Sequence, residues 1–352
     1  MPMHRPAFLI TIDTEGDYLW RAPRTITTHN ARHLPRFQSL CEQYGLRPTW
    51  LTNYEMVMDP CYQEFARDLL ARKTGEVGMH LHAWNSPPLS FRLTDDDMRF
   101  HPYLIEYPLP VMAAKIRYLT ELLESVFGQK MRSHRAGRWA FNAQYAHLLV
   151  QNGYAVDCSV TPHISWQGTP GHPGGNGGTD YRLFPEGCYL MDLTAIQRPG
   201  ASGLLQVPVT IRTTPFHALR QKTGPFEHRL RRHCAVCLRL LQRLPTVRWL
   251  RPNGNNRREM LSLLQTIKRR KEPYAEFILH SSELMPGGSP TFRTEREIDR
   301  LYADLEALFA SAAQDFSGQT LTEFYLTQTT TESPKADASL VDGCQGARHK
   351  GG

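Results

Sequence analysis

The 352-residue sequence has no long apolar segment, no export-type leader and no cysteine framework. No stretch approaches the ~20 predominantly apolar residues that a membrane-spanning helix needs. The apolar run at 7–12 is shorter than most signal-peptide cores and ends in acidic residues, so we interpret it as a first strand and expect a cytosolic protein. The seven cysteines, an odd number at irregular spacing, do not indicate a set of disulfides.

A structural zinc site built from cysteines is also not indicated. Cys234 and Cys237 form a Cys-x-x-Cys pair, but no second ligand pair stands at a suitable spacing. Both cysteines share one helical face with Leu230, Leu238 and Leu241. We therefore interpret the pair as packing residues of a helix.

The formal net charge of +7 is concentrated in one segment. Residues 217–252 contain nine Lys or Arg against one acidic residue, Glu227. A basic amphipathic helix there indicates peripheral contact with an anionic surface, such as the inner face of a membrane, or with an anionic substrate. A solvated helix face is the alternative. No nucleic-acid partner is expected, because no reading motif accompanies the charge.

Short apolar runs alternate with longer segments of helical period. Apolar side chains recur at i, i+3 and i+4 from Met112 to Val126 and stop before Gly128, and a further helix is expected to open at Thr294 with Glu297 as its capping-box partner. This alternation predicts an α/β fold with a mostly parallel sheet or barrel whose strand ends carry the chemistry. The expected strands are 8–13, 48–52, 77–82, 154–159, 204–210 and 275–280.

The pattern predicts one domain at 1–326, with the basic segment 217–252 as a helical excursion from it. The Gly- and Pro-rich stretch 168–179 is expected to be a long surface loop near the substrate. From residue 327 onward the chain is polar and poor in large apolar side chains, so 327–352 is expected to be a disordered tail.

Acidic and histidine side chains cluster at the ends of two expected strands. Asp13, Glu15 and Asp17 stand at alternate positions, and extended chain points such side chains the same way. Carboxylates at a strand end suit a metal ion or a general base, and an acidic turn is the alternative. His80 and His82 stand two apart in the third expected strand, so both imidazoles face one side and can form half of a metal site.

Three further polar residues lie near strand ends. Arg135 follows a helix and can hold a carboxylate base through a bidentate contact. Asp157 lies near the end of one expected strand, and an apolar strand delivers His280 to its own end, where a histidine can act as a general acid. An exposed arginine and a structural histidine are the alternatives.

Five polar blocks, in this order, resemble the motifs of the polysaccharide deacetylase superfamily (NodB-type carbohydrate esterases), and most of all its WalW-like branch. The resemblance runs from about Leu9 to Phe324. It implies an irregular (β/α) barrel of about seven strands. It also implies a divalent metal, often zinc, held by one acid and two histidines. The blocks are 11–17, 76–82, 133–139, 157–162 and 277–283.

The resemblance implies roles for the acidic residues and for Arg135. Residues 11–13 match the start of the family's Thr-Phe-Asp-Asp motif, so Asp13 is expected to be the catalytic base. Glu15 is the nearest acid to the motif's metal ligand. Arg135 matches the arginine of the family's Arg-x-Pro-Tyr motif, whose Pro-Tyr pair is missing here, and is expected to orient Asp13.

The remaining matches concern histidines. His80 matches the first histidine of the second motif, whereas Trp84 stands where the second one belongs, so His82 is expected to replace it as a ligand. Asp157 resembles the acid that keeps the catalytic histidine protonated, and His280 resembles that histidine.

The function implied is hydrolysis of an acyl group, expected to be acetyl, from an amino sugar in a glycan or glycan precursor. The metal would activate water, Asp13 would accept its proton, and His280 would protonate the leaving amine. Three alternatives remain open. They are an inactive homologue that binds a glycan or a partner, a hydrolase of another C–N or glycosidic bond, and a membrane-surface adaptor.

Overall fold

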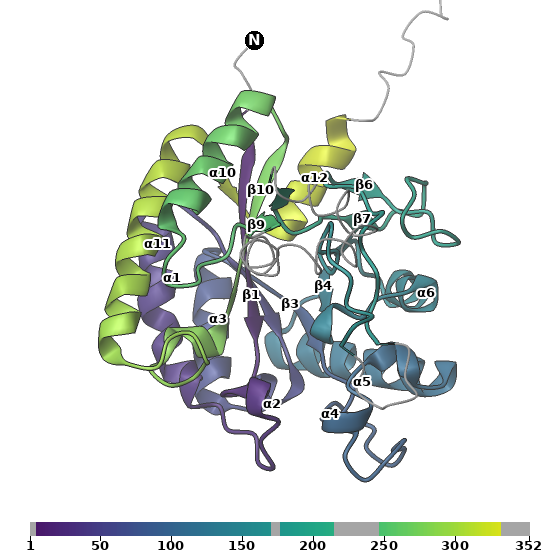
Figure 1. Cartoon of the computed structure of the whole chain (residues 1–352). Coiled ribbons are helices and arrows are strands. Elements are labelled where there is room, and N and C mark those ends of the chain that lie inside the picture. The colour runs from purple at the N-terminus through teal and green to yellow at the C-terminus, as the bar shows by residue number, and fades with distance from the viewer. Residues whose placement is uncertain (1–4, 170–176, 215–245, 332–352) are drawn as a thin grey trace, which may run out of the picture.

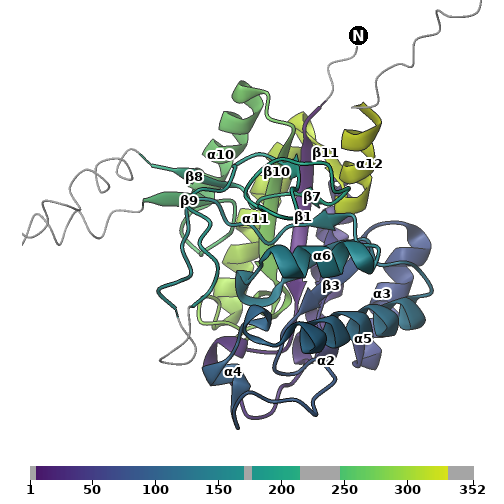
Figure 2. The same ribbon diagram turned by 90° about the vertical axis from the view of Figure 1, so that its right-hand side faces the viewer.

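The computed structural model describes residues 5–169, 177–214 and 246–331. Its strands are β1 (Ala7–Thr14), β2 (Thr49–Thr52), β3 (Glu76–Leu81), β4 (Ser133–Ala136), β5 (Val156–Asp157), β6 (Tyr189–Leu190), β7 (Leu205–Gln206), β8 (Ile211–Thr213), β9 (Val247–Trp249), β10 (Tyr274–His280) and β11 (Ser317–Gln319). Nine of them form one sheet in the order β10-β1-β2-β3-β4-β5-β7-β6, with β11 also paired to β1. Strands β8 and β9 form a separate antiparallel pair beside it (Figure 2).

The sheet is parallel from β10 to β7 and curls into an open half barrel, and only the edge strand β6 runs the other way. This confirms the predicted α/β barrel. Because the strands run in one direction, their carboxyl ends gather on one side of the molecule, at the bottom of Figure 1. The loops on that side therefore hold the candidate site.

The helices pack around the outside of the curled sheet (Figures 1 and 2). They are α1 (Leu34–Gln43), α2 (Tyr54–Val57), α3 (Pro60–Arg72), α4 (Asp97–Phe100), α5 (Leu109–Phe127), α6 (Ala143–Gln151), α10 (Arg257–Arg270), α11 (Glu295–Asp315) and α12 (Leu321–Thr331), with short 3₁₀ turns η1 (Leu19–Arg21), η2 (His29–His33), η3 (Leu104–Glu106), η4 (Gly137–Trp139) and η6 (Ser281–Leu284). Phe8 of β1 and Phe277 of β10 meet Phe309 of α11 at ring distances of 6.0 and 5.8 Å, which places the main core between sheet and helices.

The two predicted helix signals are confirmed. Gly128 ends α5 in the left-handed conformation, with φ 67°, which glycine adopts at little cost. Thr294 caps α11, because its hydroxyl accepts from the Glu297 amide and the Glu297 carboxylate accepts from the Thr294 amide.

Several predictions lie wholly or partly outside the described residues. Most of the basic segment 217–252 does so, together with its Cys-x-x-Cys pair, and their roles stay predictions. Helix α12 runs to Thr331, past the domain end predicted at residue 326, and the rest of the predicted tail is not described. Among the described residues, no helix is long and apolar enough to cross a membrane.

Candidate active site

The three predicted metal ligands meet at the carboxyl ends of β1 and β3. Glu15 directly follows β1, His80 lies in β3 and His82 follows it, and all three side chains are buried. The Glu15 Oε2 atom lies 2.9 Å from His82 Nε2 and 3.4 Å from His80 Nε2, and the two Nε2 atoms are 2.9 Å apart. One atom from each residue therefore faces a common point.

The charge around this group favours a cation. His80 Nδ1 donates to the Arg135 carbonyl at 3.0 Å, which directs Nε2 at the group. Burial alone would lower the pKa of His80, but the Asp13 and Glu15 carboxylates outweigh it and raise that pKa. Burial lowers the pKa of His82 to about 4, so its imidazole is neutral at pH 7. Ligand atoms around a tetrahedral zinc ion lie roughly 3.3 Å apart, given bonds of about 2.0–2.1 Å. The distances between the three ligand atoms are close to that value.

The loop after β1 selects Glu15 rather than Asp17 as the acidic ligand. The Ser281 hydroxyl bridges the Glu15 backbone, accepting from its amide and donating to its carbonyl, both at 3.1 Å. The Asp17 carboxylate instead accepts from the His29 and Asn30 amides at the start of η2. Asp17 thus has a structural role.

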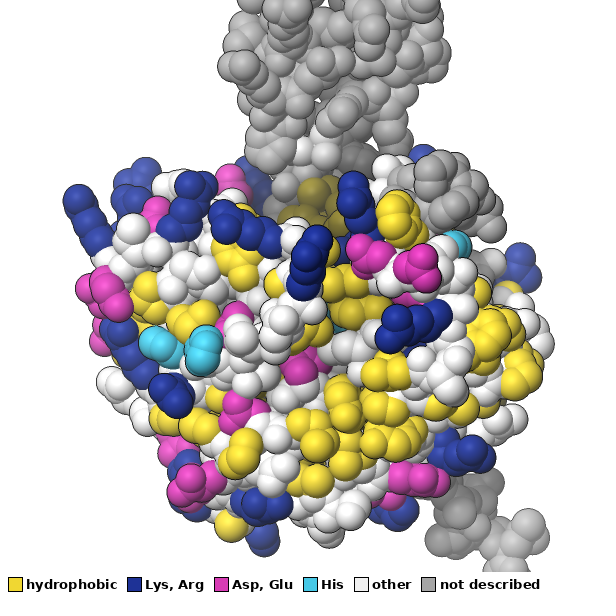
Figure 3. Space-filling model, turned by 90° about the horizontal axis from the view of Figure 1, so that it is seen from below, with side chains coloured by type: hydrophobic (Ala, Val, Ile, Leu, Met, Phe, Trp, Pro, Cys, Tyr) yellow, Lys and Arg dark blue, Asp and Glu magenta, His cyan; other side chains and the backbone are white. Residues whose placement is uncertain are grey.

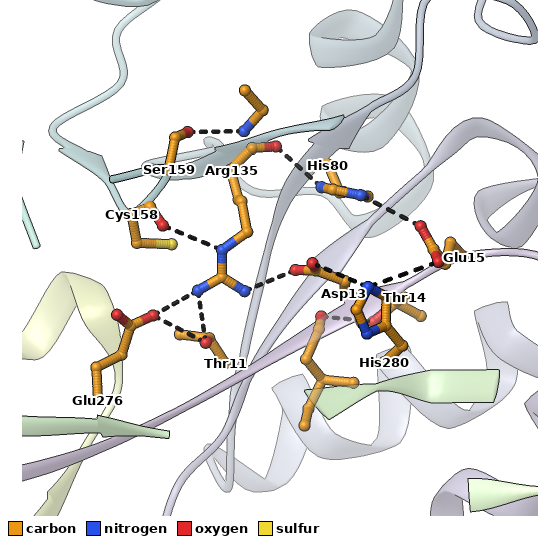
Figure 4. A network of polar contacts seen from close by, with 12 residues as sticks. Thr11, Asp13, Thr14, Glu15, His80, Arg135, Cys158, Ser159, Glu276 and His280 are labelled. Carbon is orange, nitrogen blue, oxygen red and sulfur yellow. Dashed lines mark hydrogen bonds and ion pairs between the residues drawn. The ribbon is translucent and has the colours of Figure 1, made fainter. Parts of the chain in front are cut away.

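Arg135, fully buried in β4, is the centre of a polar network (Figure 4). It donates to Asp13 Oδ1 at 2.6 Å and to Thr11 Oγ1 at 2.7 Å, contacts the Glu276 carboxylate, and donates from Nε to the Cys158 carbonyl at 3.1 Å. One guanidinium nitrogen reaches Asp13, not the two of the bidentate contact that we expected. The predicted pairing of Arg135 with Asp13 is otherwise present.

Two buried acids share this one guanidinium. Burial alone would raise the pKa of Asp13, but the Arg135 charge, with those of His80 and His280, outweighs it and lowers that pKa. Burial raises the pKa of Glu276 to about 8 despite Arg135. At pH 7 Asp13 is therefore a carboxylate, while Glu276 holds a proton. Sequence analysis missed Glu276, although a single acid in an apolar strand is an unusual feature.

His280 stands at the end of β10 and faces the same point. Its Nε2 atom lies 3.7 Å from Asp13 Oδ2 and 3.8 Å from Glu15 Oε1. Its Nδ1 atom lies 3.1 Å from Glu283 Oε2 and 3.0 Å from an Arg251 guanidinium nitrogen, and the same nitrogen lies 3.1 Å from that Glu283 oxygen. Burial opposes ionisation of Glu283, yet Arg251 and His280 lower its pKa to about 2. Glu283, three residues after His280, is a second buried acid beside the site to which sequence analysis gave no role.

The predicted pairing of Asp157 with His280 is wrong. The Asp157 carboxylate accepts from His134 Nδ1 and from the Ser159 hydroxyl, both at 2.7 Å, and His134 Nε2 lies 2.8 Å from the Tyr145 hydroxyl. The cause is the sheet order: His134 of β4 is the register partner of Asp157 in β5. Asp157 therefore stabilises the β4–β5 pair.

A cavity of about 310 Å³ opens above these groups. Its floor includes Asp13, Glu15, His82 and His280. Figure 3 looks onto this face, where exposed hydrophobic side chains lie among basic and acidic ones. The Trp84 ring packs 4.1 Å from His82, so the residue at the position of the family's second histidine is a cavity wall. The aromatic walls are Trp20, Trp84, Tyr103, Trp139 and Trp166.

No family model and no curated protein matches the sequence. Solved structures do match the fold. A candidate glycoside hydrolase/deacetylase from Parabacteroides distasonis has a TM-score of 0.58 and 14% identity, over 95% of this chain and 74% of that one. A candidate polysaccharide deacetylase from Mycobacterium smegmatis has a TM-score of 0.50 and 13% identity, over 94% and 93% of the two chains. The chain has the polysaccharide-deacetylase fold. Because a deacetylase fold alone does not establish an activity, the function is argued from the site.

Proposed function

We propose that the chain is a metal-dependent hydrolase that removes an acyl group, acetyl in the simplest case, from an amino sugar of a glycan or glycan precursor. One observation carries the proposal. A Glu–His–His ligand group, a carboxylate held by a buried arginine and a strand-end imidazole face one point below an aromatic cavity. This combination of a ligand group, a base and an acid is what metal-assisted amide hydrolysis requires.

Glu15, His80 and His82 are the residues that would hold the ion. Two imidazoles and one carboxylate match the three protein ligands of catalytic zinc sites, so zinc is the expected metal. A bound ion would polarise the acyl carbonyl and lower the pKa of a water molecule. The crowding of the three ligand atoms, 2.9 to 3.4 Å apart, supports this assignment.

Asp13 is suited to accept the proton of the attacking water. Arg135 fixes one of its oxygens at 2.6 Å, while the other faces His280. Because the protonated Glu276 is neutral, Asp13 is the carboxylate that balances the Arg135 charge. Asp13 therefore remains an ionised base in a buried position.

His280 is suited to protonate the leaving amine, which departs readily only as a neutral amine. The ionised Glu283 and Arg251 both contact Nδ1, at 3.1 and 3.0 Å, which fixes the ring so that Nε2 points into the site. Arg251 also pairs with Glu283. Glu283 thus takes the role that sequence analysis gave to Asp157.

The tryptophans favour a sugar substrate, since flat aromatic rings pack well against the apolar faces of sugar rings. Glycoside cleavage is less well supported. Such enzymes use two carboxyl groups as acid and base, whereas here Arg135 engages Asp13 and two histidines engage Glu15.

The test is acetate release from an N-acetylglucosamine oligosaccharide by zinc-reconstituted protein. Asp13→Asn should lower kcat by about 100-fold or more and keep the zinc, because Asp13 acts as a base and not as a ligand. Asp68→Asn, an exposed change in α3, is the matched control and should behave as the wild type. Zinc-loaded protein that binds acylated amino sugars but never releases acetate would instead be an inactive homologue.

A further inference from the structure

One cavity residue, Arg138, is not used by the proposed chemistry. It follows β4 in a left-handed conformation, with φ 53°, and Trp139 after it has φ 61°. Side chains with a Cβ atom adopt this region at a cost of about 1 kcal/mol or more, and such strain persists where the surrounding structure enforces it. Close packing at the preceding residue, Gly137, enforces this conformation. A Cβ atom on Gly137 would lie only 2.4 Å from the Leu81 carbonyl oxygen. The chain packs directly on the end of β3 and presents Arg138 to the cavity.

The side chain of Arg138 is exposed. Within the described parts of the chain, its charge has no acidic partner, because no carboxylate lies within 4.0 Å of its guanidinium. Its guanidinium carbon instead lies 5.6 Å from the centre of the Trp84 ring, a cation–π distance. The other two arginines of the site differ, since Arg135 pairs with Asp13 and Arg251 pairs with Glu283.

Trp84 forms the cavity wall beside Arg138 with its ring. Its indole Nε1 is buried and has no acceptor among the described residues. Because that nitrogen has almost no exposed surface, a ligand in the cavity meets the Trp84 ring and not its N–H. The Arg138 guanidinium, by contrast, lines the cavity, is exposed and can only donate. A ligand that pairs with it must bring acceptor oxygens, and an anionic group matches its charge as well.

We infer that the substrate is an acidic glycan, in which a carboxylate or phosphate group beside the acylated sugar binds Arg138 at the Trp84 wall. The inference rests on the proposed function and adds the chemical class of its substrate. A neutral glycan would leave the Arg138 charge without an anionic partner from the ligand. The strained backbone would then hold an arginine in the cavity for no gain in binding.

The test compares three probes by quenching of tryptophan fluorescence, with zinc-loaded protein at low salt. They are a neutral N-acetylglucosamine tetrasaccharide, a tetrasaccharide alternating N-acetylglucosamine with glucuronate, and UDP-N-acetylglucosamine as the phosphate source. One of the two anionic probes should bind about tenfold more tightly than the neutral one, the factor that one charge-assisted hydrogen bond supplies. Which of the two does so identifies the anionic group.

Arg138→Gln should remove this preference and leave the dissociation constant of the neutral probe unchanged. Arg117→Gln, an exposed change of equal charge in α5, is the control and should keep the preference. Equal binding of all three probes by the wild type overturns the inference, as does an Arg138→Gln variant that weakens every probe alike. If acetate is nevertheless released from the neutral tetrasaccharide, the proposed function survives. If no probe binds and no acylated sugar releases acetate, both fail.

Discussion

The proton on Glu276 predicts a measurable pH dependence of stability. Its side chain is fully buried, and burial raises its pKa from 4.5 to about 8. Between these values the unfolded chain ionises Glu276 while the folded protein keeps it protonated, so ionisation favours unfolding. The stability that protonated Glu276 contributes to the folded state is fully present below about pH 4.5, is lost as the pH rises, and is gone by about pH 8. At roughly 1.4 kcal/mol per pH unit, the loss is at most on the order of 5 kcal/mol.

Glu276→Gln isolates this loss, because glutamine stays neutral in both states. Urea unfolding of wild type and variant at pH 5, 6, 7 and 8 gives the difference in their free energies of unfolding. That difference should move in favour of the variant with rising pH, by a few kcal/mol across the series. Glu64→Gln, on the exposed side of α3, is the control and should run parallel to the wild type. A difference that stays constant from pH 5 to 8 would show that Glu276 is ionised in the folded protein, and the sharing of Arg135 would need another explanation.

Two further substitutions test whether Glu283 or Asp157 is the carboxylate that supports His280. Glu283→Gln should lower kcat at unchanged zinc content, because the Glu283 carboxylate lies 3.1 Å from His280 Nδ1 and helps to fix that ring. A kcat equal to that of the wild type would show that Glu283 has no part in the chemistry. Asp157→Ala should cost about 1–3 kcal/mol of unfolding free energy, because it leaves the buried, neutral His134 ring without an acceptor. The folded fraction should keep its acetate release. Lost activity at unchanged stability would restore Asp157 to the chemistry.

Much of the sheet was predictable because its central strands are apolar and end in polar residues. Strands β1, β2, β3 and β10 lie within a residue or so of their predicted positions. Strand β4 was missed, since its interior carries Ser133, His134 and Arg135. Their burial depends on partners in other strands that no local pattern indicates. Strands β5 and β7 are shorter than predicted, because few of their residues pair regularly with neighbours.

The site was predictable as a set of residues but not as a set of pairs. Strand-end position placed Asp13, Glu15, His80, His82 and His280 together, and the structure shows the same group. The assignment of Asp157 failed because sequence order does not show that β5 adjoins β4 while β10 adjoins β1. The aromatic walls were missed for a similar reason, since they come from separate loops.

The metal content of the purified protein tests the central claim most directly. Elemental analysis after zinc reconstitution should find close to one equivalent in the wild type and in His147→Ala, an exposed histidine of α6. The same analysis should find almost none in His80→Ala, His82→Ala or Glu15→Ala, because each removes one of three ligands. Wild-type protein without zinc, or a His82→Ala variant that keeps its zinc, would contradict the account.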